Sequence, residues 1–86
     1  MRNFKVGDIV KHFKRDLVKL KGDNDLSYLY KIIGFAYDTT NECFVVVYEA
    51  LYDNHNLFAR EQTEFQSEVD KSKYPDAKQQ YRFEVV

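Results

Sequence analysis

Two runs of alternating residues joined by a short polar turn constrain the fold of this chain more than any other feature. Residues 28–37 (YLYKIIGFAY) and residues 42–51 (ECFVVVYEAL) would place mostly apolar side chains on both faces of an extended strand. The four polar residues between them (DTTN) are typical of a hairpin loop. We therefore predict a hairpin covered on both faces, as in a closed or sandwiched sheet. Gly34 in the first run predicts a bulge or a sharp bend.

Shorter segments on either side of this hairpin complete an all-β prediction. The further strand candidates are residues 8–13, 57–60, 66–70 and 81–86. Residues 61–64 predict one helical or 3₁₀ turn that carries Phe65 into the core. Residues 14–27 predict an exposed inserted excursion that could form a hairpin, or could hold a helical turn or short strand around Leu17. The expected fold is a small barrel of five to six short, strongly bent antiparallel strands, with at most one helical or 3₁₀ turn.

The size and composition of the chain exclude several classes of protein. With 86 residues and 10.3 kDa, residues 1–86 are expected to form a single domain that buries roughly 64% of its unfolded surface. The chain is 44% hydrophobic and 31% charged, which argues against disorder. No apolar stretch is long enough to span a bilayer, and no signal peptide is visible. The single cysteine, Cys43, excludes an internal disulfide, so we expect a cytoplasmic protein without membrane partners.

The charges divide the sequence into unlike parts although the net charge is only -1. Residues 1–21 carry a balance of +5, residues 22–69 a balance of -7, and residues 70–86 a balance of +1. The basic part could bind the phosphates of a nucleic acid, or it could be a solvated strand edge and loop. The candidate nucleic-acid-binding residues are Lys11, Lys14, Arg15, Lys19 and Lys21.

Catalytic chemistry finds little support in the residues. Cys43 with His12 or His55 is the one conceivable nucleophile and base pair, and a lone cysteine in a core-like strand is usually an inert small hydrophobe. No spacing of His, Cys, Asp and Glu predicts a metal site, and no glycine-rich motif predicts a phosphate-bearing cofactor. We expect no catalytic residues, no metal and no cofactor.

The end of the second strand carries a more informative group of residues. Tyr48 and Tyr52 flank that strand end, and Arg60 is one of two cations in a strongly acidic part of the chain. Arg60 could be paired structurally with Glu49 or a neighbouring acid, or it could stand beside the tyrosine rings as an anion clamp.

The order of several motifs resembles a known family. The stretch VGDIVKHFK at residues 6–14, the run VVYEALY at residues 46–52 and LFAR at residues 57–60 precede Phe65 and the final Arg82-Phe83. This sequence resembles the bacterial family called domain of unknown function 1653, whose members look like SH3-like small β-barrels. Nearly the whole chain takes part, and the VVYEALY run is its specific section. The resemblance implies a fold but no established activity. Positions that match the family pattern are His12, Phe13, Lys14, Tyr48, Ala50, Leu51, Tyr52, Arg60, Phe65, Arg82 and Phe83.

These observations favour an SH3-like barrel that acts as a non-catalytic binding or accessory module. Its expected partner is a small anionic ligand, a peptide carboxylate or another protein, and its expected state is a monomer or a homodimer. One alternative is a nucleic-acid accessory protein that uses residues 11–21, and another is a structural subunit whose tyrosine-rich face packs on a copy of itself. The candidate ligand-binding residues are His12, Tyr48, Tyr52, Arg60 and Arg82.

Overall fold

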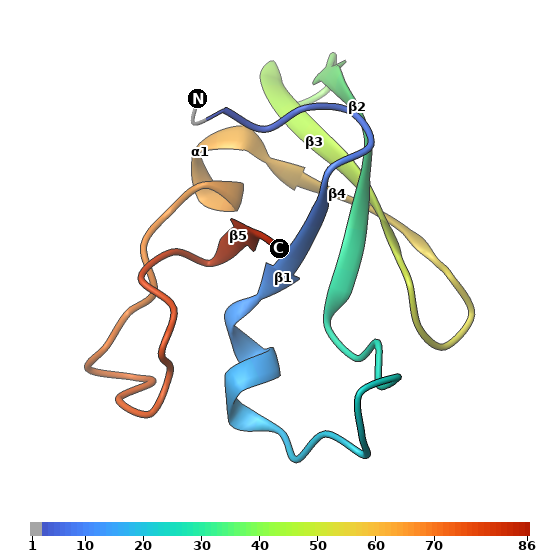
Figure 1. Cartoon of the computed structure of the whole chain (residues 1–86). Coiled ribbons are helices and arrows are strands. Elements are labelled where there is room, and N and C mark those ends of the chain that lie inside the picture. Colours follow the sequence, from blue (N-terminus) through green and yellow to red (C-terminus); the bar gives the residue numbers. More distant parts are fainter. Residues whose placement is uncertain (1–2) are drawn as a thin grey trace.

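The regular structure of the protein is one antiparallel sheet. The computed structural model describes residues 3–86, and the five strands lie in the order β4-β3-β2-β1-β5 (Figure 1). The strands are β1 (Ile9–His12), β2 (Leu29–Asp38), β3 (Cys43–Ala50), β4 (Leu57–Glu61) and β5 (Phe83–Val85). The prediction of an all-β fold of five to six strands is confirmed. Among the described residues, no helix is long and apolar enough to cross a membrane.

The central hairpin forms as predicted and gives the sheet its bend. β2 pairs with β3 in antiparallel register from Tyr30 opposite Ala50 to Asp38 opposite Cys43. The register shifts between Ile32 and Gly34, which confirms the predicted bulge and increases the local twist. The sheet curls at β2, so that β1 and β5 lie in front of β3 and β4 (Figure 1). Nevertheless the sheet is not closed, because β4 and β5 remain its two edges.

Aromatic rings fill the space inside the bent sheet. The rings of Phe65 and Phe83 are fully buried and stack with their centroids 4.1 Å apart. Phe65 ends the short helix α1 (Gln62–Phe65), as predicted for residues 61–64. This helix begins after Glu61 because the Glu61 carboxylate accepts hydrogen bonds from the N–H groups of Thr63 and Glu64, both at 3.0 Å.

The segment after β1 differs from a hairpin. A 3₁₀-helix, η1 (Phe13–Leu17), follows β1 directly, which is the helical turn left open around Leu17. Together with α1 it makes two helical turns, where at most one was expected. Its cause is the side chain of His12, whose Nδ1 accepts a hydrogen bond from Lys14 N–H at 3.1 Å and caps the helix. The loop that follows is held by Arg15, which donates to the carbonyl oxygens of Asp25 and Ser27.

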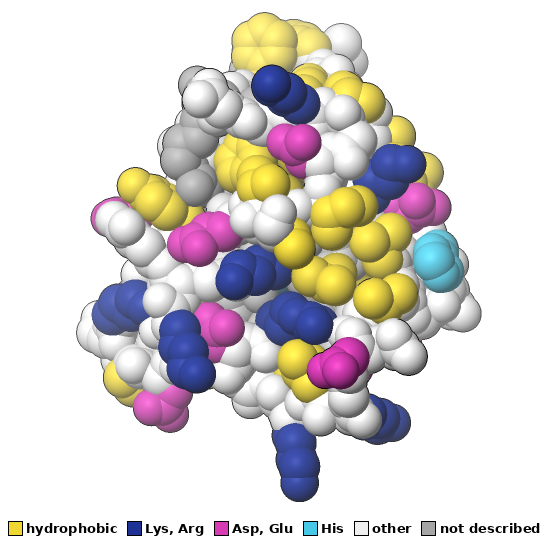
Figure 2. Space-filling view, viewed as in Figure 1, with side chains coloured by type: hydrophobic (Ala, Val, Ile, Leu, Met, Phe, Trp, Pro, Cys, Tyr) yellow, Lys and Arg dark blue, Asp and Glu magenta, His cyan; other side chains and the backbone are white. Residues whose placement is uncertain are grey.

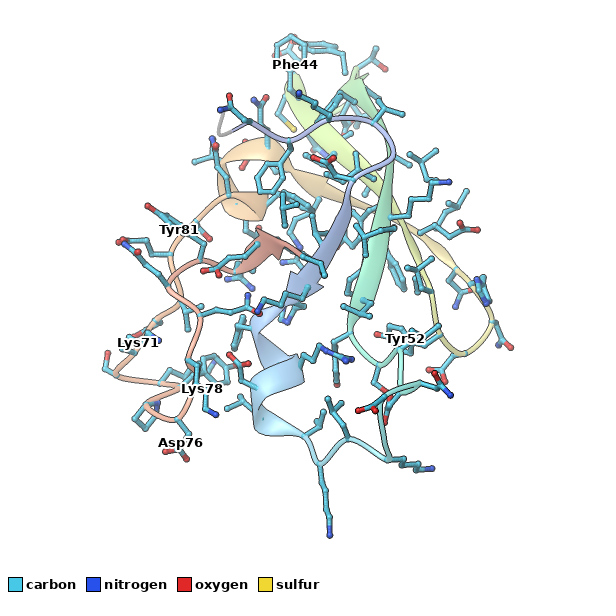
Figure 3. All side chains as sticks on the ribbon, viewed as in Figure 1. Phe44, Tyr52, Lys71, Asp76, Lys78 and Tyr81 are labelled. Atoms are coloured by element: carbon cyan, nitrogen blue, oxygen red, sulfur yellow. The ribbon has the colours of Figure 1, made fainter. Side chains whose placement is uncertain are left out.

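The segment between α1 and β5 forms a second, smaller core. The short strand expected at residues 66–70 is reduced to one isolated bridge, Glu68 with Tyr81. Side chains add to a few backbone hydrogen bonds in ordering this segment: the Asp16 carboxylate accepts from the N–H groups of Lys78 and Gln79, both at 3.0 Å. Lys71, Lys78 and Tyr81 lie along it on the left of Figure 3. The buried residues of this smaller core are Phe13 of η1 with Val69 and Ala77, and Tyr74 packs against them.

Candidate functional site

Three of the five predicted ligand-binding side chains meet around Phe83. His12 is paired with Phe83 across β1 and β5, and their rings meet edge to face at 4.9 Å. The Tyr48 ring from β3 lies 5.3 Å from the Phe83 ring, and the Arg60 guanidinium lies 5.8 Å above it. Tyr30 also touches the Phe83 ring, while Tyr28, Tyr52 and Arg82 lie next to other members of this group. We call the whole set the Phe83 cluster: His12, Tyr28, Tyr30, Tyr48, Tyr52, Arg60, Arg82 and Phe83. It joins positions more than 70 residues apart, from His12 to Phe83.

Arg60 is anchored on one side of this cluster. Its Nε donates to the Tyr48 hydroxyl at 3.2 Å, and its Nη1 forms a salt bridge of 2.5 Å with the Glu64 carboxylate. The acid that pairs with Arg60 is therefore Glu64 in α1. Glu49 stands opposite Lys31 in the register of β2 and β3 and makes no ion pair with Arg60. Because Glu64 is largely exposed, this pair fixes the direction of the guanidinium more than it stabilises the fold.

Arg82 is held by weaker contacts. Its Nε donates to Ser67 Oγ at 3.4 Å, and its guanidinium lies 5.8 Å from the centre of the Phe13 ring. Within residues 3–86 the salt bridge between Arg60 and Glu64 is the one ion pair found, so Arg82 has no carboxylate partner there. Its remaining N–H groups are free to bind an anion from outside the chain.

His12 lies within reach of the charges of both arginines and is neutral. It is 6% exposed, and its ring stacks on Phe13 at 4.4 Å. Burial first, and then the positive charges of Arg60, Arg82 and Lys14, lower the pKa of His12 to about 3. Because Nδ1 accepts from Lys14 N–H, the proton of the neutral ring is on Nε2, which is a hydrogen-bond donor. His12 is thus a structural residue and also a donor within the cluster.

Tyr52 joins the cluster through a second tyrosine. The hydroxyl groups of Tyr52 and Tyr30 share a hydrogen bond of 2.7 Å, and burial with this bond raises the pKa of Tyr30. Tyr28 links Tyr52 to His12, because its ring lies 5.7 Å from the Tyr52 ring and 6.0 Å from the His12 ring. Its backbone has a φ of 62°, a left-handed conformation that a tyrosine adopts only under the constraint of its surroundings.

The sequence analysis missed three members of the cluster, Tyr28, Tyr30 and Phe83, as site residues. Phe83 matches the family pattern, and that match was the available signal. Tyr30 lies on the inner face of β2, opposite Ala50 of β3. In the sequence its alternation with Leu29 and Lys31 predicts a core position but no role in a site. For Tyr28 no sequence signal exists, since its position depends on the left-handed turn before β2.

The basic segment lies outside the cluster for the most part. Lys11 is in β1, Lys14 and Arg15 are in η1, and Lys19 and Lys21 follow in the loop. Arg15 already donates to two carbonyl oxygens, at 3.0 Å and 2.7 Å. Figure 2 shows Lys and Arg side chains spread over this face among acidic and uncharged groups. Nucleic-acid binding by these five residues stays a prediction.

The remaining reactive groups do not gather into a further site. In the part of the chain that the structure describes, no group of three or more His, Cys, Asp and Glu side chains could hold a metal ion. Cys43 is half-buried at the start of β3. Desolvation, together with the negative charges of Asp38 and Glu61, raises the pKa of its thiol and disfavours the reactive thiolate.

The fold and the Phe83 cluster together define a small all-β domain with a cationic, aromatic site. The sequence model of the family described as "Protein of unknown function (DUF1653)" matches residues 8–85. The chain belongs to this family, which confirms the resemblance seen in its motifs. No curated protein and no solved structure matches the chain.

Proposed function

We propose that this domain is a non-catalytic binding module that holds a small oxyanion, such as a carboxylate or a phosphate, at the Phe83 cluster. The observation that carries the proposal is an imbalance of charge. The guanidinium groups of Arg60 and Arg82 lie over the Phe83 and Phe13 rings, and both rings contact neutral His12. Glu64 is the single carboxylate paired with them among the described residues. A site with this excess of positive charge attracts an anion.

The donors of the cluster suit an oxygen-bearing ligand. The guanidinium of Arg82 can meet a carboxylate or phosphate with two parallel N–H groups. The Tyr48 hydroxyl accepts from Arg60 and keeps its own proton to donate. The rings of Phe83 and Phe13 lie 5.8 Å from the two guanidinium carbons and make their surroundings less polar than water, which strengthens charge pairing. The carboxylate at the end of a peptide has the same chemistry as a free carboxylate.

Binding without catalysis agrees with the state of the two candidate reactive groups. A catalytic histidine works best with a pKa near the operating pH, whereas that of His12 is about 3. The raised pKa of Cys43 disfavours a nucleophilic thiolate, and Cys43 is at the end of β3 that pairs with Asp38. We therefore propose ligand contact alone for His12.

The variant Arg82→Gln tests the proposal. It removes the guanidinium that lacks a carboxylate partner and breaks one long hydrogen bond, so the fold should persist. We expect inorganic phosphate and acetate to shift the backbone amide resonances of β1, β3 and β5 in the wild type. Arg82→Gln should weaken this binding about tenfold, as expected for loss of one charged hydrogen bond. The measurement is titration followed by two-dimensional NMR.

The control is Lys31→Gln, which removes an exposed positive charge from β2 outside the cluster. It should leave both titrations unchanged. A short peptide with a free carboxylate, compared with its amidated form, separates a peptide end from a free anion. Equal weakening by Arg82→Gln and Lys31→Gln would reduce the effect to net charge and contradict the proposal, as would the absence of any shift at tens of millimolar anion.

A further inference from the structure

We infer that the free edge of β4 pairs with β4 of a second copy of this chain, in antiparallel register centred on Ala59. This edge shares Arg60 with the Phe83 cluster. The variants that test it change only Ala59, so each proposal can fail without the other. β4 is the last strand of the sheet and is bonded only to β3. It also carries two exposed large side chains, Leu57 at 62% and Phe58 at 42%.

The backbone of β4 offers a usable edge. Ala50 N–H, at the end of β3, donates to the carbonyl oxygen of Asn56, just before β4, at 3.0 Å. Ala50 and Asn56 are therefore a hydrogen-bonded pair of the β3–β4 ladder. Such pairs alternate along an antiparallel ladder, which turns the backbone groups of Phe58 and Arg60 toward β3 as well. The N–H and C=O groups of Leu57 and Ala59 consequently face away from the sheet. An unpaired edge of this kind is a template for another strand.

The sequence of β4 is complementary to itself in one register. With the two-fold axis at Ala59, all five residues of the strand find a partner, and Ala59 faces Ala59. Phe58 then lies opposite Arg60 of the second copy, a pairing without like charges. A shift that centres the axis on Arg60 would place two arginines opposite each other and is disfavoured. About four backbone hydrogen bonds result, two at Ala59 and one from each Glu61 N–H to Leu57 O.

The outer face of the sheet would become continuous across this junction. Leu57 and Ala59 point to the outer face, because their partners across β3 and β4 are Glu49 and Val47. Val45 and Val47 are half-buried on the same face. Pairing of two β4 strands brings the valines of both copies into one apolar strip and removes part of it from water. This strip, and a register without like charges opposite each other, favour a second copy as the partner.

The test uses opposite charges placed on the two-fold axis. In Ala59→Lys two lysines, and in Ala59→Glu two glutamates, would face each other across the paired strands, whereas in a monomer each is an exposed side chain. The edge is short and its interface small, so dimers of the wild type should form at concentrations on the order of 100 µM. Each variant alone should weaken dimerisation at least about tenfold, and an equal mixture of the two should restore it. Sedimentation equilibrium measures all four samples.

Two further observations decide the outcome. Amide hydrogen exchange at Ala59 should slow as the wild-type concentration rises, and NMR spectra should show that both variants are folded. A wild type that stays monomeric through the millimolar range would overturn the inference. So would a dimer that survives Ala59→Lys, because its two-fold axis must then lie elsewhere. Failure of the mixed variants to pair would do the same.

Discussion

Replacing Phe83 by alanine should unfold the protein or bring it to the edge of unfolding. The Phe83 ring is fully buried and touches rings from four other parts of the chain: His12, Tyr30, Tyr48 and Phe65. Its removal leaves a cavity that these large rings cannot close, and such a change costs roughly 3–5 kcal/mol of unfolding free energy. A small domain has on the order of 5–10 kcal/mol in total.

Urea unfolding followed by circular dichroism measures this loss. The matched control is Val85→Ala, two positions further along β5, where the side chain is 51% exposed. It should change the unfolding free energy by no more than about 0.5 kcal/mol, the usual range for a surface position. A cost below about 1 kcal/mol for Phe83→Ala would contradict the packing described here, because it would mean that the ring is not enclosed.

Lowering the pH from about 7 to about 4.5 should destabilise the fold by about 2–3 kcal/mol through His12 alone. The folded pKa of His12 is lowered from 6.5 to about 3. Below pH 6.5 His12 is therefore protonated in the unfolded chain but not in the folded chain. Protonation lowers the free energy of the unfolded state, so the free energy of unfolding falls. The loss continues until the pH reaches the folded pKa near 3.

Carboxylates contribute in a different pH range. Hydrogen bonds from Ser27 and Lys21 lower the pKa of Asp25 to about 2, and local hydrogen bonds also lower the pKa of Asp38 and Asp70. A lowered carboxyl pKa stabilises the fold above the unfolded value, near 4, and this stabilisation is lost only as the pH falls below it. Between about pH 6.5 and pH 4.5 the slope of stability against pH consequently reports His12.

Urea midpoints measured at several pH values, with two variants, isolate this effect. His12→Asn keeps a side-chain acceptor for Lys14 N–H but cannot take a proton, so the slope between about pH 6.5 and pH 4.5 should flatten. His55→Gln is the control, because His55 lies exposed in the loop after β3 and its replacement should leave the slope unchanged. A wild-type slope that persists in His12→Asn would show that His12 is not held neutral.

Local pattern accounts for the part of the fold that was predicted correctly. Alternation with a period of two residues specifies a strand without knowledge of its neighbours, and β2 and β3 begin and end within a residue of their predicted limits. The bulge beside Gly34 and the helical turn before Phe65 were also readable, since each depends on nearby residues. For residues 14–27 the sequence predicted an exposed segment but left its local structure open, and the strand expected at residues 66–70 is wrong. Contacts between distant segments, such as Asp16 with Lys78, decide both.

The sequence by itself determined the strands, the hairpin and the residue types of the candidate site, since these follow from alternation, turn residues and a match to a family pattern. Only the tertiary structure decided that His12 is buried and neutral, that Arg60 pairs with Glu64 and that Arg82 lacks such a partner. The physical reason is that burial and charge pairing depend on distances between segments. Those distances are set when the sheet bends at β2 and brings β1 and β5 over β3 and β4 (Figure 1).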